Sequence, residues 1–562
     1  MEQIQNNRVI TDLYRENAQF PGIALDGSDV YLCWQRFVDR HDSLMASCRR
    51  GDEVVWEREI SDGGEVLHPV ILAHGGAIWY AWSEYARENW RILARCYRDG
   101  QWGEVLTVAS GEALFFPRLF TWQGKLHVIW TEQHKGSAAA VLCPLTEAGP
   151  GAAETVSVVG EAYRAGAAEG GDGNLYVAYD GFDGKQYKLF ARARTAAGWS
   201  EEIVVSQGED WASTPWIAAK PDGAVVGWYD YGYMAVYSVR SADLTVRDGA
   251  LAAVNPQCLK EGVDWYLDLH VASNSSGLQA MAYTRSKYDV LVCTRRGSEP
   301  WSRPVLMSYG DGHCGVHPKL LVSEDDTIHL MWQFGFKNGH MERNAQVIYN
   351  HLTPTELAQQ PDYVAPPSDF TQPIPANADK RLDEHPADVV RAWLDKNGYG
   401  NLSVYFGDIH GQSGLSDGMG VDQYYHRARD KARLDFTALT DHDCYPDWTT
   451  QSEWELLRTN CRLMNKDGEL ACLLAYEWTP NEYKYDYGHK NVYYRGDEGE
   501  IFRSGDKGGM TPTDLYNSIP LHPPPPRRGL GDGERRHRLE LPRSRGAARR
   551  GDLLPPRPLR DL

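Results

Sequence analysis

A repeat of about 48 residues runs through the first part of the chain and constrains its fold more than any other feature. Pro21, Pro69 and Pro117 are each followed 13 residues later by a tryptophan. Pro215 and Trp228 have the same offset, whereas Pro318 is followed by a tryptophan after 14 residues. Two further copies carry a tyrosine at the corresponding place. The seven aromatic markers are Trp34, Trp82, Trp130, Tyr179, Trp228, Tyr283 and Trp332, spaced 48, 48, 49, 49, 55 and 49 residues apart.

Each repeat has the pattern of several short β-strands. An apolar run follows the proline, then come a Gly or Asp turn and an alternating strand, as in LHPVILAHGGAIWYAWSE, which predicts a hairpin. A third strand and a tryptophan-containing corner follow. Four short strands repeated seven times predict an all-β seven-bladed propeller over residues 1–352. We expect the N-terminal segment NRVITDLY to pair with the last repeat and close the ring.

The propeller offers few signs of chemistry. His68 and His317 directly precede marker prolines, where the innermost strand begins beside the central channel. They could line a ligand or metal site, but half-buried turn residues are the favoured interpretation. We interpret this domain as a scaffold or substrate-recruiting platform. A sialidase-like glycosidase is a further alternative, against which the lack of paired carboxylates at family-like positions argues.

Charge and cysteine pattern restrict the partners and the location. The net charge is -19, which argues against nucleic acid and anionic membrane surfaces as partners. The N-terminus has no apolar segment typical of a signal peptide. The ten cysteines form no CxxC pair, so we expect reduced thiols in a cytoplasmic protein. A small-molecule or ester substrate remains the expected partner, and its identity stays open, as does the oligomeric state.

The pattern changes after the repeats. Residues 353–400 form a Pro-rich polar linker. Residues 401–522 then alternate predicted strands and helices: strands at SVYFGDI, LDFTALT and ELACLLAYEW, and helices at VDQYYHRARDKA and SEWELLRTNCRLM. Repeated strand–helix units predict a parallel sheet or barrel with its chemistry at the carboxyl ends of the strands. The chain is therefore expected to be multidomain, with an incomplete α/β domain behind the propeller.

Polar residues gather at those strand ends. Asp408, His410, Gln412 and Asp417 follow the first strand, TDHD with His442 follows the second, and Glu477 lies at the third. Side chains alternate along an extended segment, so His410 and Gln412 point the same way. Imidazole and carboxylate groups that converge in this way predict a site for Zn, Mn or Fe.

The motifs GDIHGQSGLSDG, LTDHD, AYEWT and GHKNVYY, in this order, resemble those of the PHP (polymerase and histidinol phosphatase) superfamily of metal-dependent phosphoesterases, and more closely an uncharacterised bacterial branch of it. The resemblance covers roughly residues 395–522. It implies a distorted β/α barrel with two or three divalent metal ions on its carboxyl face. The closing Asp-x-His motif and the last strands of that barrel are absent.

The resemblance also implies roles for individual residues. His442 and Glu477 are assigned to catalysis. Gln412 stands where the family has a second histidine, and an amide oxygen is a poorer ligand for a transition metal than imidazole. The implied metal ligands are His410, Gln412, Asp417, His442, Glu477, His489 and His522.

The function implied by the resemblance is hydrolysis of a phosphoester or similar ester by a metal-bound water. The alternative is a catalytically inactive, truncated product that acts only as a propeller binding module. Residues 523–562 bear on this choice, because they contain 11 Arg, 8 Pro, 7 Leu and 5 Gly and no β-branched or aromatic residue. We predict that this segment adds no strand to the barrel, either as a basic disordered tail or, preferably, as the product of a frameshift.

Overall fold

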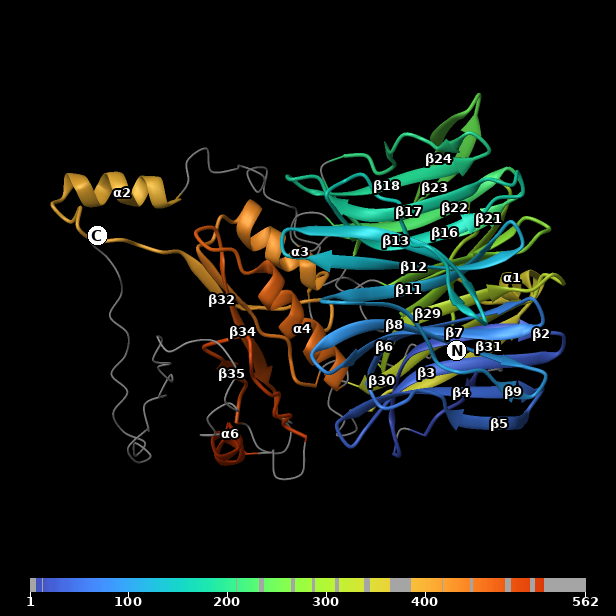
Figure 1. The fold of residues 1–562 in the computed structure, drawn as a ribbon, viewed down its shortest axis with the longest axis horizontal. Helices are drawn as coiled ribbons and strands as arrows, with labels where there is room; N and C mark the ends of the chain where they lie inside the picture. Colours follow the sequence, from blue (N-terminus) through green and yellow to red (C-terminus); the bar gives the residue numbers. More distant parts are fainter. Residues whose placement is uncertain are drawn as a thin grey trace.

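The computed structural model describes residues 7–12, 14–208, 210–231, 237–263, 268–285, 289–308, 313–337, 344–363, 386–416, 418–444, 448–480, 487–505 and 511–519. Figure 1 shows two parts: a large body of β-sheets made by the repeats, and a smaller part with helices at one side of it. Asp417, His522 and the tail 523–562, for which predictions were made above, lie outside the described residues.

Five separate antiparallel sheets of four or five strands make up most of the repeat region. The first two repeats form β2 (Asn17–Asp26), β3 (Asp29–Val38), β4 (His41–Arg50) and β5 (Glu53–Glu59), then β6 (Glu65–His74), β7 (Ala77–Ala86), β8 (Asn89–Arg98), β9 (Gln101–Trp102) and β10 (Leu106–Gly111). The last three form β21 (Trp211–Lys220), β22 (Gly223–Tyr231), β23 (Tyr237–Arg247) and β24 (Ala250–Val263), then β25 (Leu269–Ser273), β26 (Leu278–Arg285), β27 (Asp289–Arg296) and β28 (Val305–Leu306), then β29 (His313–Val322), β30 (Ile328–Lys337) and β31 (Gln346–Leu352) with β1 (Arg8–Val9).

The third and fourth repeats share one ten-stranded sheet. A single parallel pair, Ala138 with Glu161, joins their strands. The β-propeller-like fold is therefore confirmed, but the expected seven separate blades are not, because two repeats pair into one sheet among the described residues. The strands of this sheet are β11 (Leu114–Trp122), β12 (Lys125–His134), β13 (Ser137–Thr146), β14 (Gly149–Pro150), β15 (Glu154–Thr155), β16 (Glu161–Glu169), β17 (Leu175–Phe182), β18 (Tyr187–Thr195), β19 (Gly198–Trp199) and β20 (Ile203–Val204).

All seven aromatic markers lie on the second strand of their repeat. Their exposed fractions range from 0% at Trp34 to 3% at Trp228. A large aromatic side chain at this place packs between neighbouring sheets, which is why the sequence repeats it. The markers lie on β3, β7, β12, β17, β22, β26 and β30.

The N-terminus closes the ring as expected. Strand β1 pairs antiparallel with β31, with Arg8 opposite Tyr349 and Val9 opposite Ile348. The amide of Ile10 continues this pairing by donating to the carbonyl of Val347 at 2.8 Å. The two ends of the repeat region thus cover each other's free edges.

The smaller part contains one open four-stranded sheet in the order β32-β33-β34-β35. Three strands are parallel and β35 is antiparallel to β34. The expected incomplete β/α barrel is wrong for the described residues, because the strands form a mixed, open sheet with β32 and β35 at its edges. Its elements are β32 (Gly407–Gly411), α3 (Val421–His426), the π-helical turn η2 (Arg427–Lys431), β33 (Phe436–Leu439), α4 (Gln451–Met464), β34 (Ala471–Trp478), β35 (Lys490–Tyr493) and α6 (Pro512–Ser518), preceded by α1 (Pro354–Gln359) and α2 (Pro386–Lys396).

Helices α3 and α4 lie between this sheet and the propeller (Figure 1). The α4 helix begins at a capping box of Thr450 and Glu453 and packs against β4, β6 and β7. The indole of Trp90 donates to Thr459 of α4 at 2.9 Å, and residues of both parts share one hydrophobic cluster. No helix among the described residues is long and apolar enough to cross a membrane.

Candidate functional site

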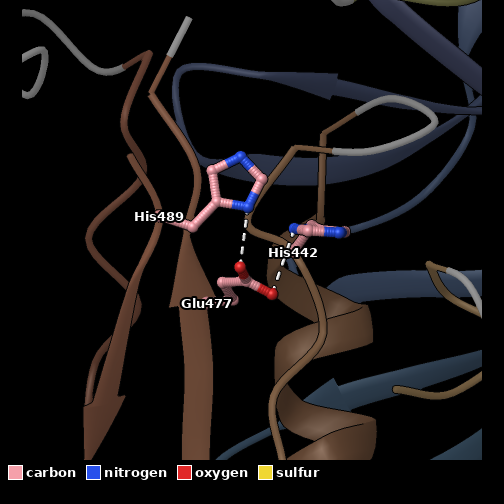
Figure 2. Close-up of side chains that lie close together, drawn as sticks. All are labelled: His442, Glu477 and His489. Carbon is pink, nitrogen blue, oxygen red and sulfur yellow. Dashed lines mark hydrogen bonds and ion pairs between the residues drawn. The ribbon is translucent and has the colours of Figure 1, made fainter. Parts of the chain in front are cut away.

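Three predicted residues meet at the carboxyl ends of the parallel strands. His442 follows β33, Glu477 lies near the end of β34, and His489 precedes β35. The β34–β35 hairpin places Glu477 opposite Asn491, which brings His489 back over the carboxylate. Figure 2 shows both imidazoles turned toward Glu477. The possible ligand atoms of the three residues lie within 4.8 Å of one another.

Glu477 is the charged centre of this strand-end cluster. Its Oε1 lies 2.7 Å from Nδ1 of His489, and its Oε2 lies 3.4 Å from Nδ1 of His442. The carboxyl group is buried, whereas His489 is partly exposed. Burial alone would raise the pKa of Glu477, but the hydrogen bond from His489 and the nearby His442 lower it below its ordinary value. Glu477 is therefore an ionised carboxylate at neutral pH.

His410 and Gln412 both reach the cluster, as the alternation along the strand predicted. Nε2 of His410 lies 3.9 Å from Oε2 of Glu477, and its Nδ1 lies 2.8 Å from the hydroxyl of Thr440. The Gln412 amide nitrogen lies 3.0 Å from Nε2 of His442 and donates to Glu477 at 3.1 Å. Gln412 thus contacts the same carboxylate through its nitrogen rather than offering an oxygen.

The two aspartates of the TDHD motif, Asp441 and Asp443, have structural roles. Burial raises the pKa of Asp441, and its carboxylate accepts hydrogen bonds from Ser413 and Ser416. Asp443 accepts from the amide of Thr479 at 2.7 Å. Both aspartates hold the loops behind the cluster in place.

A second polar site lies in the central channel of the propeller. In six repeats a bulge in the innermost strand puts a non-glycine residue into the left-handed region, with φ from 37° at Arg164 to 56° at Phe116. A bulge re-aims the side chain of the extra residue, and here every such side chain lines one cavity of about 230 Å³. The six residues are Phe20, His68, Phe116, Arg164, Thr214 and His317.

His68 and His317 are half-buried, as expected, but they lie at strand bulges rather than in turns, and both line this cavity. Nδ1 of His317 lies 2.7 Å from Oδ2 of Asp268. Burial alone would raise the pKa of Asp268, but His317 lowers it below the ordinary value. Burial lowers the pKa of His68 to about 3, and Nδ1 of its ring has no hydrogen-bond partner. His68 is therefore neutral, and its ring stacks on Phe116 with centroids 4.6 Å apart.

Arg118 and Lys319 form the cationic side of the channel. Each directly follows a marker proline, and both lie over the ring of Trp216, 3.7 and 4.3 Å from its centroid. Sequence reasoning missed both. A charged residue after the proline, inside an otherwise apolar run, was the signal that could have found them.

The smaller part covers one end of this cavity. Residues 414, 415 and 418–423 line it, and Asp422 at the start of α3 reaches the propeller. Arg164 donates to both carboxylate oxygens of Asp422, at 2.6 and 3.0 Å, and Tyr187 donates to it at 2.5 Å. A buried, charge-assisted contact thus holds the smaller part against this end of the channel.

No family model and no curated protein matches the chain. Among solved structures it is similar to a PL25 ulvan lyase, with 10% identity over 63% of this chain and all of that one at a TM-score of 0.44. It is also similar to polysaccharide lyase Uly1, with 10% identity over 59% of this chain and 89% of that one at a TM-score of 0.42. A third is α-L-arabinanase of Penicillium chrysogenum, with 11% identity over 63% and 99% of the two chains at a TM-score of 0.34.

These findings correct two predictions. The identification with the PHP superfamily is wrong, because no family model matches the chain and the described strands of the smaller part form an open, mixed sheet instead of a barrel. The predicted metal-dependent phosphoesterase function is wrong with it. The motifs GDIHGQSGLSDG and LTDHD do mark strand ends, but four short motifs did not specify the strands around them.

Proposed function

We propose that the central channel of the propeller binds a saccharide unit and that the protein acts on carbohydrate. The observation that carries the proposal is the cavity of about 230 Å³ into which the bulges of six repeats aim their side chains. Its volume is below the roughly 300–1,000 Å³ of sites for drug-sized ligands, so it suits one sugar ring.

The lining has the two chemical faces that a sugar needs. Phe20, Phe116 and Tyr229 offer apolar rings to the C–H face of a pyranose, and the charged groups and hydroxyls between them can hydrogen-bond its edges. The His317–Asp268 pair adds an imidazole oriented by a carboxylate, which is an arrangement suited to general acid–base chemistry.

The test is a calorimetric titration of the protein with monosaccharides, paired with Thr214→Trp, which places a bulky ring in the cavity. We expect binding to the native protein and none to this variant. Binding that survives in Thr214→Trp would place the sugar elsewhere. Trp substituted at the exposed Thr107 of β10 is the matched control.

We further propose that the strand-end cluster holds one divalent cation, with Zn, Mn and Fe as the candidates. His442, Glu477 and His489 supply two imidazoles and a carboxylate within 4.8 Å of one another, which is a suitable donor set for these ions. His410 is close enough to join them after a small side-chain rotation. The role proposed for this ion is to fix the ends of β33, β34 and β35.

We also propose that each repeat corresponds to one blade, with two blades joined in the ten-stranded sheet. The support is the burial of one marker on the second strand of every repeat. An experimental structure with a different count would reject this. The cytoplasmic location and the lack of nucleic-acid and membrane partners stay predictions.

A further inference from the structure

Buried cations of the propeller are paired with carboxylates at most places. Arg164 contacts Asp180 at 2.7 Å and also Asp422, Lys220 contacts Asp243 at 2.9 Å, and Arg295 contacts the same Asp243. This pairing is what the low dielectric of a protein interior demands, because an unpaired buried charge is destabilising.

Arg118 and Lys319 are half-buried cations that lack such pairing. Neither forms an ion pair with any carboxylate of the described residues. Arg118 donates one hydrogen bond, to the carbonyl of Pro215 at 2.7 Å, and Lys319 lies over the ring of Trp216. Asp268 acts on both cations but is already engaged with His317, and Asp180, which acts more strongly on Arg118, is paired with Arg164. Both cations line the cavity, so their open side faces the place of a ligand.

We propose that Arg118 and Lys319 bind the carboxylate of an acidic sugar in the channel. The inference rests on the proposed function and names its substrate class. The Arg118 guanidinium can hold a planar carboxylate through two N–H donors, and the Lys319 ammonium, which also lies over Trp216, adds a point charge.

The charges of the pocket favour a single negative charge on the ligand. Arg118 and Lys319 bring two positive charges and Asp268 one negative charge to the same space, so a ligand with a single carboxylate balances the charge that remains. Burial lowers the pKa of Lys319 to about 8 and that of Arg118 to about 9. A bound carboxylate would offset the cost of burying these two positive charges.

The experiment compares two sugars that differ only at the carboxylate, methyl glucuronide and methyl glucoside, by calorimetric titration of the full chain. We expect the native protein to bind the acidic sugar about tenfold to a hundredfold more tightly, since hydrogen bonds to charged groups contribute about 1.5–3 kcal/mol. Lys319→Met should remove most of this preference and Lys319→Arg should keep it. Lys125→Met, at an exposed lysine of β12, is the matched control.

Each outcome separates the inference from the function on which it rests. Equal binding of the two sugars, or a preference that survives in Lys319→Met, would overturn the carboxylate assignment and leave the channel as a saccharide site. Inorganic phosphate or sulfate that displaces the acidic sugar at lower concentration would also overturn it. If neither sugar binds, the proposed function fails together with the inference. Circular dichroism of each variant checks that the fold is kept.

Discussion

The central channel and the strand-end cluster are two polar sites of opposite electrical character. In the channel, Arg118 and Lys319 are cations without a direct carboxylate partner among the described residues. In the cluster, Glu477 is a carboxylate contacted by the imidazoles of His442 and His489. The first site suits an anion and the second suits a cation. One chain thus combines two complementary charge patterns, built by different structural devices.

The two devices differ in how they place side chains. In the channel, a bulge at the same point of successive repeats turns one residue inward, so each repeat adds a single group. In the cluster, the ends of adjacent parallel strands bring together residues that already lie side by side. A substitution at one bulge therefore alters a single group of the channel lining. The cluster, in contrast, depends on the pairing of several strands in one sheet.

The largest effect is expected where the two parts meet. Asp422→Ala leaves Arg164 in a buried site with only Asp180 to pair with it. Breaking a buried ion pair by removing one partner costs about 3–5 kcal/mol. We expect denaturant unfolding to show a loss of this size, with the smaller part released first. Asp388→Ala, at an exposed aspartate of α2, is the control. A loss below about 1 kcal/mol would mean that the contact is no stronger than a surface ion pair.

The second effect tests the cationic character of the channel through pH. The pKa of Lys319 falls from 10.5 to about 8 because burial disfavours the charged ammonium. Between these values the unfolded chain holds the proton and the folded chain does not, so stability rises with pH by up to about 3 kcal/mol from this group. Asp268, Arg118 and Cys33 are the charged and titratable groups that act on it.

The measurement is the free energy of unfolding of the native protein and of Lys319→Met at pH 7.5 and at pH 10.5, values chosen as about the two ends of this window. Because other groups also titrate here, the difference between the two proteins is the relevant quantity. We expect Lys319→Met to be the more stable at the lower pH and to lose that advantage at the higher. A difference that does not change with pH would contradict the depressed pKa.

The third effect tests the cluster. His442→Ala removes one of three close donors, so we expect affinity for Zn²⁺ to fall on the order of a hundredfold. His134→Ala is a matched control, since that histidine also lies beside a glutamate, at 3.1 Å, but on an exposed part of β12. The measurement is competition with a chromogenic chelator. Equal zinc binding by both variants would reject the proposed cation site.

The repeats made most of the propeller predictable. A buried aromatic residue recurs because each repeat has the same gap to fill, and the strand pattern at Trp82 or Trp130 follows from that. The ring closure at Val9 was also readable, because the last repeat lacks a strand. The ten-stranded sheet could not be predicted. The pairing of Ala138 with Glu161 involves one residue from each side and leaves no pattern in the sequence.

The two polar sites also differ in how far the sequence predicted them. His442, Glu477 and His489 were predicted because strand ends are visible as the end of an apolar run. Arg118 and Lys319 were missed because they lie 201 residues apart, and only the closed ring brings them together. The left-handed conformation of Phe116 has no signal either, because phenylalanine does not favour it. Short motifs around His410 also suggested a family whose barrel is not formed by the described strands.

The smallest expected effect is on stability, and it compares the N-terminal caps of two helices, α4 and α6. Thr450 and Thr511 both begin a helix with a capping box, for α4 and α6 respectively. The Thr450 hydroxyl also accepts a hydrogen bond at 3.2 Å from Gln35 of the propeller, whereas α6 buries only Leu515. We expect Thr450→Ala to lower the free energy of unfolding by about 1–2 kcal/mol, from the lost cap and the lost contact. Thr511→Ala should change it by less than about 0.5 kcal/mol, because α6 can fray without the rest of the fold.

Thr450→Ser, which keeps the hydroxyl, is the control. Equal losses at the two threonines would show that α4 gains nothing from the propeller beyond its own cap.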